Sequence, residues 1–364
     1  MTKTPSLPKH PRLTLLANAA SSHTQKWALE LAKRGWHIDI FSFLSAEIPD
    51  VTVHLIPKLL GGKADAILRS RWVRKRLAEI QPDIVHAHYA TSFGLLGGLS
   101  GRHPLVISAW GSDIFSFPRT SVLHGALLRW ILKQADQLCS TSQIMAQEML
   151  LYTTSNLQRK IAIIPFGVDV ERFSPPTSSL KTEQVVFGVA KHLHAVYGLD
   201  LLIQAFAQVY SRHHGKVRLR IAGDGPEKEN LVRLTHEHQV EEAVEWVGHL
   251  PNTEVADFYR SLDVVVVPSR KESFGVTAVE GAACGLPVIG SRIEGLPEVI
   301  IDGKTGILVP PENALKLSEA MELLLLDPKQ REQMGEAGRR FVLEKYDWQK
   351  NVTQMERIYR ALLN

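Results

Sequence analysis

Short apolar runs alternate with helical stretches along the whole chain, and this alternation most limits its possible folds. In the first half the runs are aliphatic or β-branched, as in "HIDIFSF", "DIVHAHY" and "PLVISAW". Helical stretches lie between such runs, at residues 24–34, 65–79, 122–134 and 143–152. Strands that alternate with helices predict a parallel sheet whose two faces are both covered. We therefore expect an α/β protein.

The alternation restarts after residues 170–184, a polar and proline-containing stretch that is typical of a linker. The second half then contains "RLRIAGDG", "DVVVVPS" and "LPVIGS", again with helices between them. Since 364 residues are about twice the usual size of one domain, we expect two doubly wound, Rossmann-like domains that face each other across a cleft. We place them at residues 1–178 and 179–345, followed by a last helix, 346–364, that could cross back to the first domain.

Charge is divided unevenly between the two halves. Residues 1–165 carry 19 Lys and Arg against 10 Asp and Glu, whereas the remainder carries 23 against 28. The basic residues are densest in a helical stretch that contains Arg69, Arg71, Arg74, Lys75 and Arg76. This stretch is either a solvated helix face or a contact with an anionic membrane surface, where each basic residue contributes about 1 kcal/mol. No recognition motif accompanies the charge, so we do not expect a nucleic-acid partner.

The cysteine content and the apolar runs bear on localisation. Cys139 and Cys284 are the only cysteines, which favours a reducing cytoplasm over a disulfide framework. No apolar run approaches the roughly 20 residues that span a bilayer, and residues 1–13 lack the apolar core of a signal peptide. We expect a cytoplasmic protein that the basic cluster could hold at the inner face of the membrane.

The stretch "KESFGVTAVE", residues 271–280, follows a predicted strand and opens a helix at Gly275. Ligands of open α/β sheets bind beyond the carboxyl ends of strands. Backbone N–H groups at a helix start have no intrahelical partner, and a glycine allows close approach of an anion such as a diphosphate. Glu272 and Glu280 could accept hydrogen bonds from sugar and ribose hydroxyls. Alternatively, they are acids that the helix dipole favours near a helix start.

Residues 268–311 closely resemble the donor-binding segment of the GT-B glycosyltransferases of family four. The resemblance rests on the Glu-x7-Glu pair and on "CGLPVIGS", "GLPEVI" and "DGKTGILVPP". It extends to "IPFGVDVERFSP" (164–175), which resembles the domain junction of the family. It also extends to "IAGDGPEKENLV" (221–232), which resembles its Gly-x-Gly-Pro turn. The resemblance implies two facing Rossmann-like domains and a retaining glycosyltransferase.

The resemblance also implies roles for individual residues. Glu272 would hold hydroxyls of the donor sugar and, with Lys191, carry the catalytic function. Lys191 matches the first of two cations that family members use to stabilise the leaving phosphate. Tyr197 stands where the second, a lysine, is typical, and His192 or His194 could substitute for it. The nucleotide sugar would contact the donor-binding residues Ser273, Phe274, Gly275, Val276, Thr277, Glu280, Gly223 and Gly225.

The first half departs further from the family pattern. Trp110 replaces the histidine of the usual His-Gly-x-Asp motif, while Asp113 is retained as a candidate for acceptor binding or loop positioning. His88 ends a strand on the acceptor side, and His23 belongs to a stretch that resembles a subgroup of the family. We expect His86 and His88 to point to opposite sides of their strand and therefore not to chelate one metal ion. No metal or cofactor is expected.

Together these observations predict transfer of a sugar from a nucleotide-diphosphate donor to an acceptor hydroxyl. The acceptor implied by the resemblance is a bacterial cell-surface polysaccharide or a lipid-linked saccharide. Two other possibilities stay open. One is a nucleotide-sugar epimerase or phosphorylase-like enzyme with the same fold. The other is a non-catalytic saccharide- or nucleotide-binding relative, which the residues at positions 197 and 110 leave open.

Overall fold

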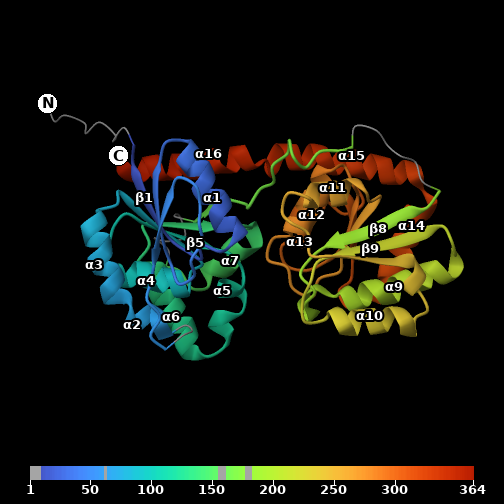
Figure 1. Cartoon of the computed structure of the whole chain (residues 1–364), viewed down its shortest axis with the longest axis horizontal. Coiled ribbons are helices and arrows are strands. Elements are labelled where there is room, and N and C mark those ends of the chain that lie inside the picture. Colours follow the sequence, from blue (N-terminus) through green and yellow to red (C-terminus); the bar gives the residue numbers. More distant parts are fainter. Residues whose placement is uncertain (1–9, 61–63, 155–160, 177–182) are drawn as a thin grey trace. The chain divides into compact units, whose positions relative to one another are not determined.

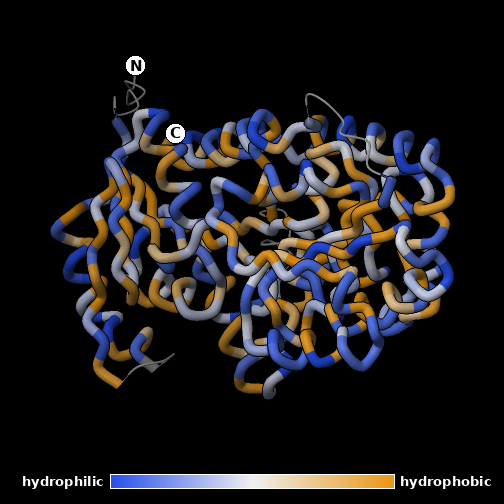
Figure 2. The backbone as a smooth tube through the Cα atoms, turned by 45° about the vertical axis from the view of Figure 1, so that its right-hand side comes forward, coloured by the Kyte–Doolittle hydropathy of each residue, from blue (hydrophilic) through white to orange (hydrophobic). Residues whose placement is uncertain are grey.

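The computed structural model describes residues 10–60, 64–154, 161–176 and 183–364, and it divides into two compact units (Figure 1). Unit 1 consists of Met1–Phe166 and Gln349–Asn364, and unit 2 of Gly167–Trp348. Each unit has one parallel sheet with helices on both faces. Figure 2 colours the same backbone by hydropathy, and hydrophobic and hydrophilic stretches alternate along the chain in both units. The predicted α/β class, with two Rossmann-like sheets, is confirmed.

The sheet of unit 1 has the strand order β3-β2-β1-β4-β5-β6-β7. Strands β4 and β5 are buried at every residue, as expected of strands that are covered on both faces. The strands are β1 (Arg12–Leu16), β2 (His37–Ser42), β3 (Val51–Leu55), β4 (Ile84–His88), β5 (Leu105–Ala109), β6 (Gln137–Ser140) and β7 (Ile161–Ile163). The helices are α1 (Ser22–Lys33), α2 (Ala64–Leu68), α3 (Ser70–Ile80), α4 (Ser92–Ser100), α5 (Ser112–Phe115), α6 (Val122–Lys133), α7 (Gln143–Leu150) and α16 (Trp348–Leu363).

The sheet of unit 2 has the strand order β10-β9-β8-β11-β12-β13. Its core includes fully buried aromatic and aliphatic side chains such as Phe187, Phe206 and Met321. The strands are β8 (Val185–Ala190), β9 (Val217–Ala222), β10 (Val244–Gly248), β11 (Val264–Val267), β12 (Val288–Ser291) and β13 (Gly306–Val309). The helices are α9 (Leu199–Arg212), α10 (Lys228–Glu237), α11 (Val255–Arg260), α12 (Val276–Ala283), α13 (Leu296–Val299), α14 (Ala314–Leu326) and α15 (Pro328–Lys345).

The connection into unit 2 packs against that unit earlier than the sequence indicated. The predicted boundary lies at residue 178, whereas unit 2 begins at Gly167. Phe173 is 4% exposed, and the Arg339 guanidinium donates to the carbonyl oxygens of Val170 and Phe173. These contacts attach the first part of the expected linker to α15.

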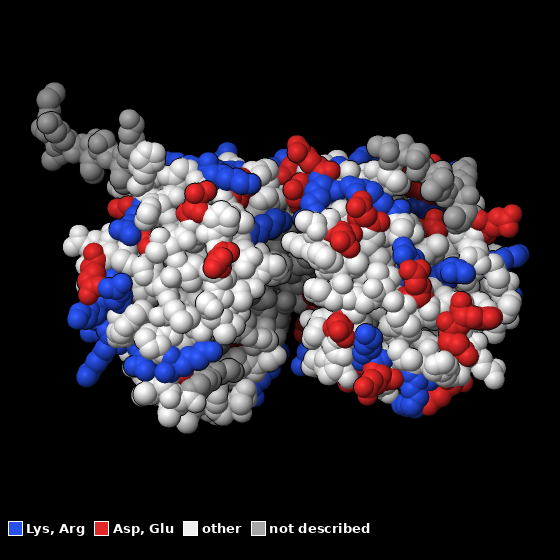
Figure 3. Space-filling view, viewed as in Figure 1, with Lys and Arg blue, Asp and Glu red and all other residues white. Residues whose placement is uncertain are grey.

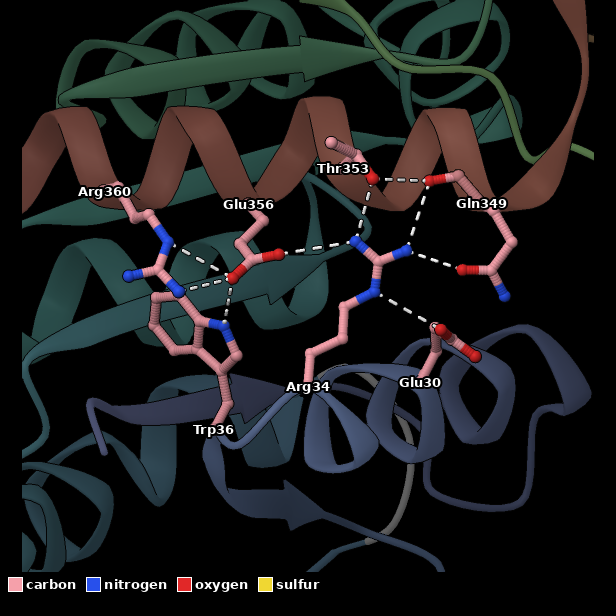
Figure 4. Close-up of polar contacts among 7 residues, drawn as sticks. All are labelled: Glu30, Arg34, Trp36, Gln349, Thr353, Glu356 and Arg360. Atoms are coloured by element: carbon pink, nitrogen blue, oxygen red, sulfur yellow. Dashed lines mark hydrogen bonds and ion pairs between the residues drawn. The ribbon is translucent and has the colours of Figure 1, made fainter. Parts of the chain in front are cut away.

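Helix α16 packs on unit 1 through a polar network (Figure 4). Arg34, at the end of α1, donates to Thr353 Oγ1 at 2.9 Å and to Gln349 Oε1 at 2.6 Å. Glu356 accepts from Arg34 and from Trp36 Nε1, both at 3.3 Å, and also from Arg360. The contacts of Arg34 and Trp36 with α16 join residues more than 300 positions apart.

A buried bond adds to this network. The Tyr359 hydroxyl lies 2.6 Å from His86 Nδ1 on β4, and both side chains are buried. Burial, followed by the charge of His88, lowers the pKa of His86 well below its usual value. His86 is therefore a neutral hydrogen-bonding partner that ties α16 to the central sheet.

We expect Glu356→Gln to destabilise unit 1 by about 1–3 kcal/mol at neutral pH, because Glu356 accepts hydrogen bonds from two cations in a largely buried position. Burial alone would raise the pKa of Glu356, but hydrogen bonds from Arg360, Trp36 and Arg34 lower it overall. The carboxylate therefore stabilises the fold above its unfolded-state pKa, and this contribution is lost as the pH falls through the folded-state value.

Denaturant unfolding of the wild type and of Glu356→Gln measures this contribution. The difference in the free energy of unfolding between the wild type and Glu356→Gln should be largest near pH 7 and should disappear at acidic pH. Glu79→Gln, which removes an exposed ion pair with Arg76 on unit 1, serves as a control and should cost less than about 1 kcal/mol. Equal losses in the two variants would contradict the role given to Glu356.

Candidate functional site

The candidate site lies where the strand order of unit 2 reverses. Successive strands are added on one side from β8 to β10, and on the other side from β11 to β13. Strands β8 and β11 are hydrogen-bonded neighbours, with Phe187 opposite Val264. In open α/β sheets such a reversal leaves a crevice beyond the carboxyl ends of the two strands. The loops after β8 and β11 carry Lys191 and Glu272, the two residues predicted to be catalytic.

These two residues form an ion pair. Lys191 Nζ lies 2.7 Å from Glu272 Oε2, and the two side chains are 14% and 11% exposed. The ring of Tyr197 covers the same ammonium, with its centroid 4.3 Å from Nζ. The tyrosine that stands at the expected lysine position is therefore a neighbour of the remaining cation. A largely buried lysine held by one carboxylate and one aromatic ring is a positioned charge rather than a mobile surface side chain.

The backbone of Glu272 is fixed by a residue that the sequence did not single out. The Glu272 N–H donates to Glu294 Oε2 at 2.7 Å, and the N–H of Gly295 donates back to the Glu272 carbonyl at 2.9 Å. Glu294 has a φ of 37°, which is uncommon for a residue with a side chain. It directly precedes the "GLPEVI" motif, which was the only available signal.

Helix α12 begins beside this loop. Gly275, just before its first residue, has a φ of 103°, and an added Cβ would lie 2.9 Å from the side chain of Leu296. Thr277 Oγ1 donates to the carbonyl of Ala190, at the end of β8. Among the other predicted donor-binding residues, Phe274 is buried, whereas Ser273 and Val276 are partly exposed. The helix start thus lies against the strand that leads to Lys191.

The second glutamate of the pair has a different environment. Glu280, within α12, accepts a hydrogen bond from the Tyr259 hydroxyl at 3.3 Å. Burial, followed by the charge of Glu280, raises the pKa of Tyr259 well above its usual value, so this hydroxyl remains a donor. Glu272 and Glu280 are therefore held by different partners, which allows each to contact a different part of one extended ligand.

Two glycines of the β9–α10 loop permit a close approach to the Lys191 loop. Gly223 has a φ of 138°, and an added Cβ would lie 1.9 Å from the carbonyl oxygen of Lys191. At Gly225 it would lie 2.4 Å from the carbonyl oxygen of Leu193. The Lys191 N–H donates to the carbonyl of Ala222 at 2.9 Å. The position of Lys191 therefore depends on these glycines.

A separate pocket lies near the Lys191–Glu272 pair, and neither of these two residues lines it. It has a volume of about 180 Å³, and its lining includes His194, Asp200 and Arg270. Arg270 donates through two nitrogens to Asp200 and through Nε to Glu312, at 2.7 Å in each case. His194 accepts from the N–H of Val196 at 3.5 Å.

The four acceptor-side candidates lie together in unit 1: His23 at the start of α1, His88 at the end of β4, and Trp110 and Asp113 after β5. The His23 ring stacks on Phe166 with centroids 4.4 Å apart, and the His88 ring lies 4.8 Å from that of Trp110. Burial, followed by the charge of His23, lowers the pKa of His88 to about 3. His88 is thus neutral near pH 7. It lines a small pocket together with Trp110 and Phe166.

Asp113 joins two loops at this edge. Its carboxylate accepts from the N–H groups of Ala90 and Gly111, both at 2.7 Å, and more weakly from that of Trp110. Burial raises the pKa of Asp113, although these backbone hydrogen bonds oppose the shift. Because Asp113 is fully buried and its oxygens are engaged, its environment fits loop positioning, the second of the two roles considered for it.

The expectation for His86 and His88 needs correction. Side chains two positions apart along a strand share a face, and the two rings lie 4.5 Å apart. Both ring nitrogens of His86 have protein partners, Tyr359 and Ser108. Within residues 10–60, 64–154, 161–176 and 183–364, no group of three or more His, Cys, Asp or Glu side chains is arranged to hold a metal ion.

Two family models match the chain. The model described as "Glycosyl transferases group 1" matches residues 171–341, and the one described as "Glycosyl transferase 4-like" matches residues 12–142. A glycogen synthase of Mycobacterium tuberculosis is 29% identical over 300 residues, which cover 77% of this chain and 69% of that protein.

Solved structures share the fold over nearly the whole chain. A sucrose-phosphate synthase from Thermosynechococcus elongatus has a TM-score of 0.85 at 22% identity. The match covers 97% of this chain and 99% of the synthase chain. Anabaena HepE, solved in complex with UDP and glucose, has a TM-score of 0.81 at 18% identity, covering 97% of this chain and 100% of its own.

Proposed function

Because the chain belongs to the group 1 glycosyltransferases and has their GT-B fold, we propose that it transfers a sugar, with retention, from a nucleotide diphosphate to an acceptor hydroxyl. Unit 2 binds the donor, and the more basic unit 1 binds the acceptor. The observation that carries this proposal is the Lys191–Glu272 pair at the strand-order reversal of unit 2. HepE, which has the same fold, was solved with UDP and glucose.

In this proposal the start of α12, the two glutamates and Lys191 each have a separate chemical role. The start of α12 binds the diphosphate through its free backbone N–H groups. Glu272 accepts hydrogen bonds from hydroxyls of the donor sugar, and Glu280 accepts from the ribose. The Lys191 ammonium stabilises the negative charge that develops on the departing phosphate in the transition state.

Retention follows a front-face route. The bond between the anomeric carbon and the phosphate oxygen breaks while the acceptor oxygen forms its bond on the same face. The acceptor proton passes to the departing phosphate, so no side chain has to act as a general base. Neither this step nor the binding of the donor calls for a metal ion or another cofactor.

The acceptor in this proposal is a growing cell-surface polysaccharide or a lipid-linked saccharide of a bacterium. We place the enzyme in the cytoplasm, because Cys139 and Cys284 are both buried and free, which suits a reducing compartment.

A panel of nucleotide-diphosphate sugars tests the proposal. One donor, at about 100 times its dissociation constant, should stabilise the protein by about 2.7 kcal/mol, and incubation with acceptor should release nucleoside diphosphate. Isomerised donor without acceptor would indicate an epimerase, and release that requires inorganic phosphate would indicate a phosphorylase. Binding without any turnover would indicate a non-catalytic relative. Absence of both binding and turnover across the panel would contradict the proposal.

Tyr197 supplies a further prediction on the same site. We expect Tyr197→Ala to lower the transfer rate about 3- to 30-fold, because it removes a ring that holds the Lys191 ammonium through a cation–π contact of about 0.5–2 kcal/mol. Tyr197→Phe keeps the ring and should retain most of the rate. Steady-state kinetics should show the loss mainly in kcat, since the leaving group gains its charge in the transition state. An equally large loss in Tyr197→Phe would contradict this role.

A further inference from the structure

Unit 1 exposes large apolar side chains beside its basic cluster. The four that lie around α2 are Leu59, Leu60, Ile67 and Leu68, with 60%, 74%, 59% and 46% of their surface exposed. Exposed apolar groups that gather in one place, next to polar residues, are typical of surfaces that contact a protein or a membrane. No helix in the described parts of the chain is long and apolar enough to span a bilayer.

The loop before α2 holds its leucines outward. The backbone N–H groups of Leu59 and Leu60 both donate to Asp65 Oδ1, at 3.1 and 3.0 Å. Asp65 itself is 1% exposed, and Arg69 Nη2 donates to the carbonyl of Lys58 at 3.4 Å. The backbone is thus fixed to α2 through a buried carboxylate, while the two leucine side chains remain in solvent.

The following helix continues this surface with positive charge. Arg71, Arg74 and Lys75 are spaced at intervals that fall on one side of α3. All three are exposed, as are Ile67 and Leu68 at the end of α2. The opposite side of the same stretch is buried through residues such as Val73 and Leu77. In Figure 3, basic side chains gather over α2 and α3, at the left margin of the view. The apolar residues therefore come first along the stripe, and the cations follow.

Basic side chains outnumber acidic ones along this stretch of the sequence. In the described residues 58–60 and 64–80, six side chains are basic and two are acidic. One of the acids, Asp65, is buried, and the other, Glu79, pairs with Arg76. Arg74 donates to the carbonyl of Leu99 and Arg69 to that of Lys58, so both keep their charge.

We propose that this stripe, formed by Leu59, Leu60, Ile67, Leu68, Arg71, Arg74 and Lys75, docks unit 1 on an anionic lipid surface. The apolar side chains enter the boundary between headgroups and acyl chains, and the cations contact the anionic headgroups. Charge complementarity favours a lipid surface, because each basic residue near it raises the partition coefficient about fivefold, and the leucines and isoleucine add the apolar contribution. The inference rests on the proposed function only in that a lipid-linked acceptor would lie at the same surface.

Flotation of the full chain with lipid vesicles tests the proposal. The wild type should bind phosphatidylcholine vesicles that contain about 30% phosphatidylglycerol at about 50 mM salt, and release at about 0.5 M salt. Leu59→Ser/Leu60→Ser and Arg71→Gln/Arg74→Gln/Lys75→Gln should each lower the partition coefficient at least tenfold. Leu315→Ser/Leu326→Ser, which changes exposed leucines of unit 2, is the matched control and should bind like the wild type.

Two further measurements keep the result interpretable. Thermal unfolding of each variant shows whether unit 1 remains folded. Stabilisation by nucleoside diphosphate, measured without vesicles, reports on the donor site and is expected to be unchanged. Vesicle binding that is absent in the wild type, or that persists in both patch variants, would overturn the proposal. Loss in the charge variant alone would overturn the insertion of the leucines. Failure of the nucleotide measurement with intact vesicle binding would count against the proposed function instead.

Discussion

Glu272→Gln should lower the transfer rate at least about 100-fold, because the carboxylate that we propose orients the donor sugar becomes an amide and loses its charge. Lys191 would also lose its only ion-pair partner among the described residues, at a position where its side chain is 14% exposed. We therefore expect a concurrent loss of about 1–3 kcal/mol in the free energy of unfolding of unit 2. This loss is smaller than that of a fully buried pair, because the site is partly open to solvent.

The double variant Lys191→Gln/Glu272→Gln separates these two effects. It leaves no unpaired charge, so its stability should recover most of the loss, whereas its transfer rate should stay as low as that of the single variant. Kinetics with the best donor of the panel and denaturant unfolding measure the two quantities. A Glu272→Gln enzyme with near-normal turnover would contradict the catalytic role of this residue. Recovery of activity in the double variant would contradict the role of Lys191.

Gly223→Ala should destabilise unit 2 by at least about 3 kcal/mol and remove its stabilisation by the donor. The added Cβ would lie 1.9 Å from the carbonyl oxygen of Lys191, and the residue has a φ of 138°. A flexible side chain could rotate away from the added Cβ, but a backbone carbonyl cannot. The loop that carries Lys191 therefore has to move to relieve the clash. Thermal shift with and without the donor measures both effects.

Gly215→Ala is the matched control for this variant. Gly215 has a φ of 76°, but no atom lies within 4 Å of an added Cβ. It should therefore cost only about 1–2 kcal/mol of backbone strain and leave the donor effect intact. If the two variants lost the same stability and responded equally to the donor, the close approach of the β9–α10 loop to Lys191 would not matter for donor binding.

The fold could be predicted because its signals are local. Apolar runs such as that of β11 and the helical stretches between them mark each strand and helix by their own residues. The position of the unit boundary could not be predicted in this way. Residues 170–176 are polar and contain proline, yet Phe173 and the carbonyl groups beside it pack on Arg339. A composition that is typical of a linker therefore does not show which of its residues pack against a domain.

Most candidate residues of unit 2 were singled out by motifs, and the family match supports the resemblance that rests on those motifs. The pairing of Lys191 with Glu272, 81 positions later, depends on the adjacency of β8 and β11. Glu294 could not be predicted, because neither its positive φ nor its hydrogen bond to the Glu272 N–H can be inferred from residue type. The prediction for His86 and His88 was wrong because residues two apart on a strand share a face.

Hydrogen–deuterium exchange with a saturating nucleoside diphosphate tests most directly the claim that unit 2 holds the donor site. We expect protection of three segments: the loop after β8 at 191–198, the β9–α10 loop at 223–227 and the start of α12 at 272–279. The remainder of the described chain should change little. Protection confined to unit 1, or absent from all three segments at saturation, would contradict the account.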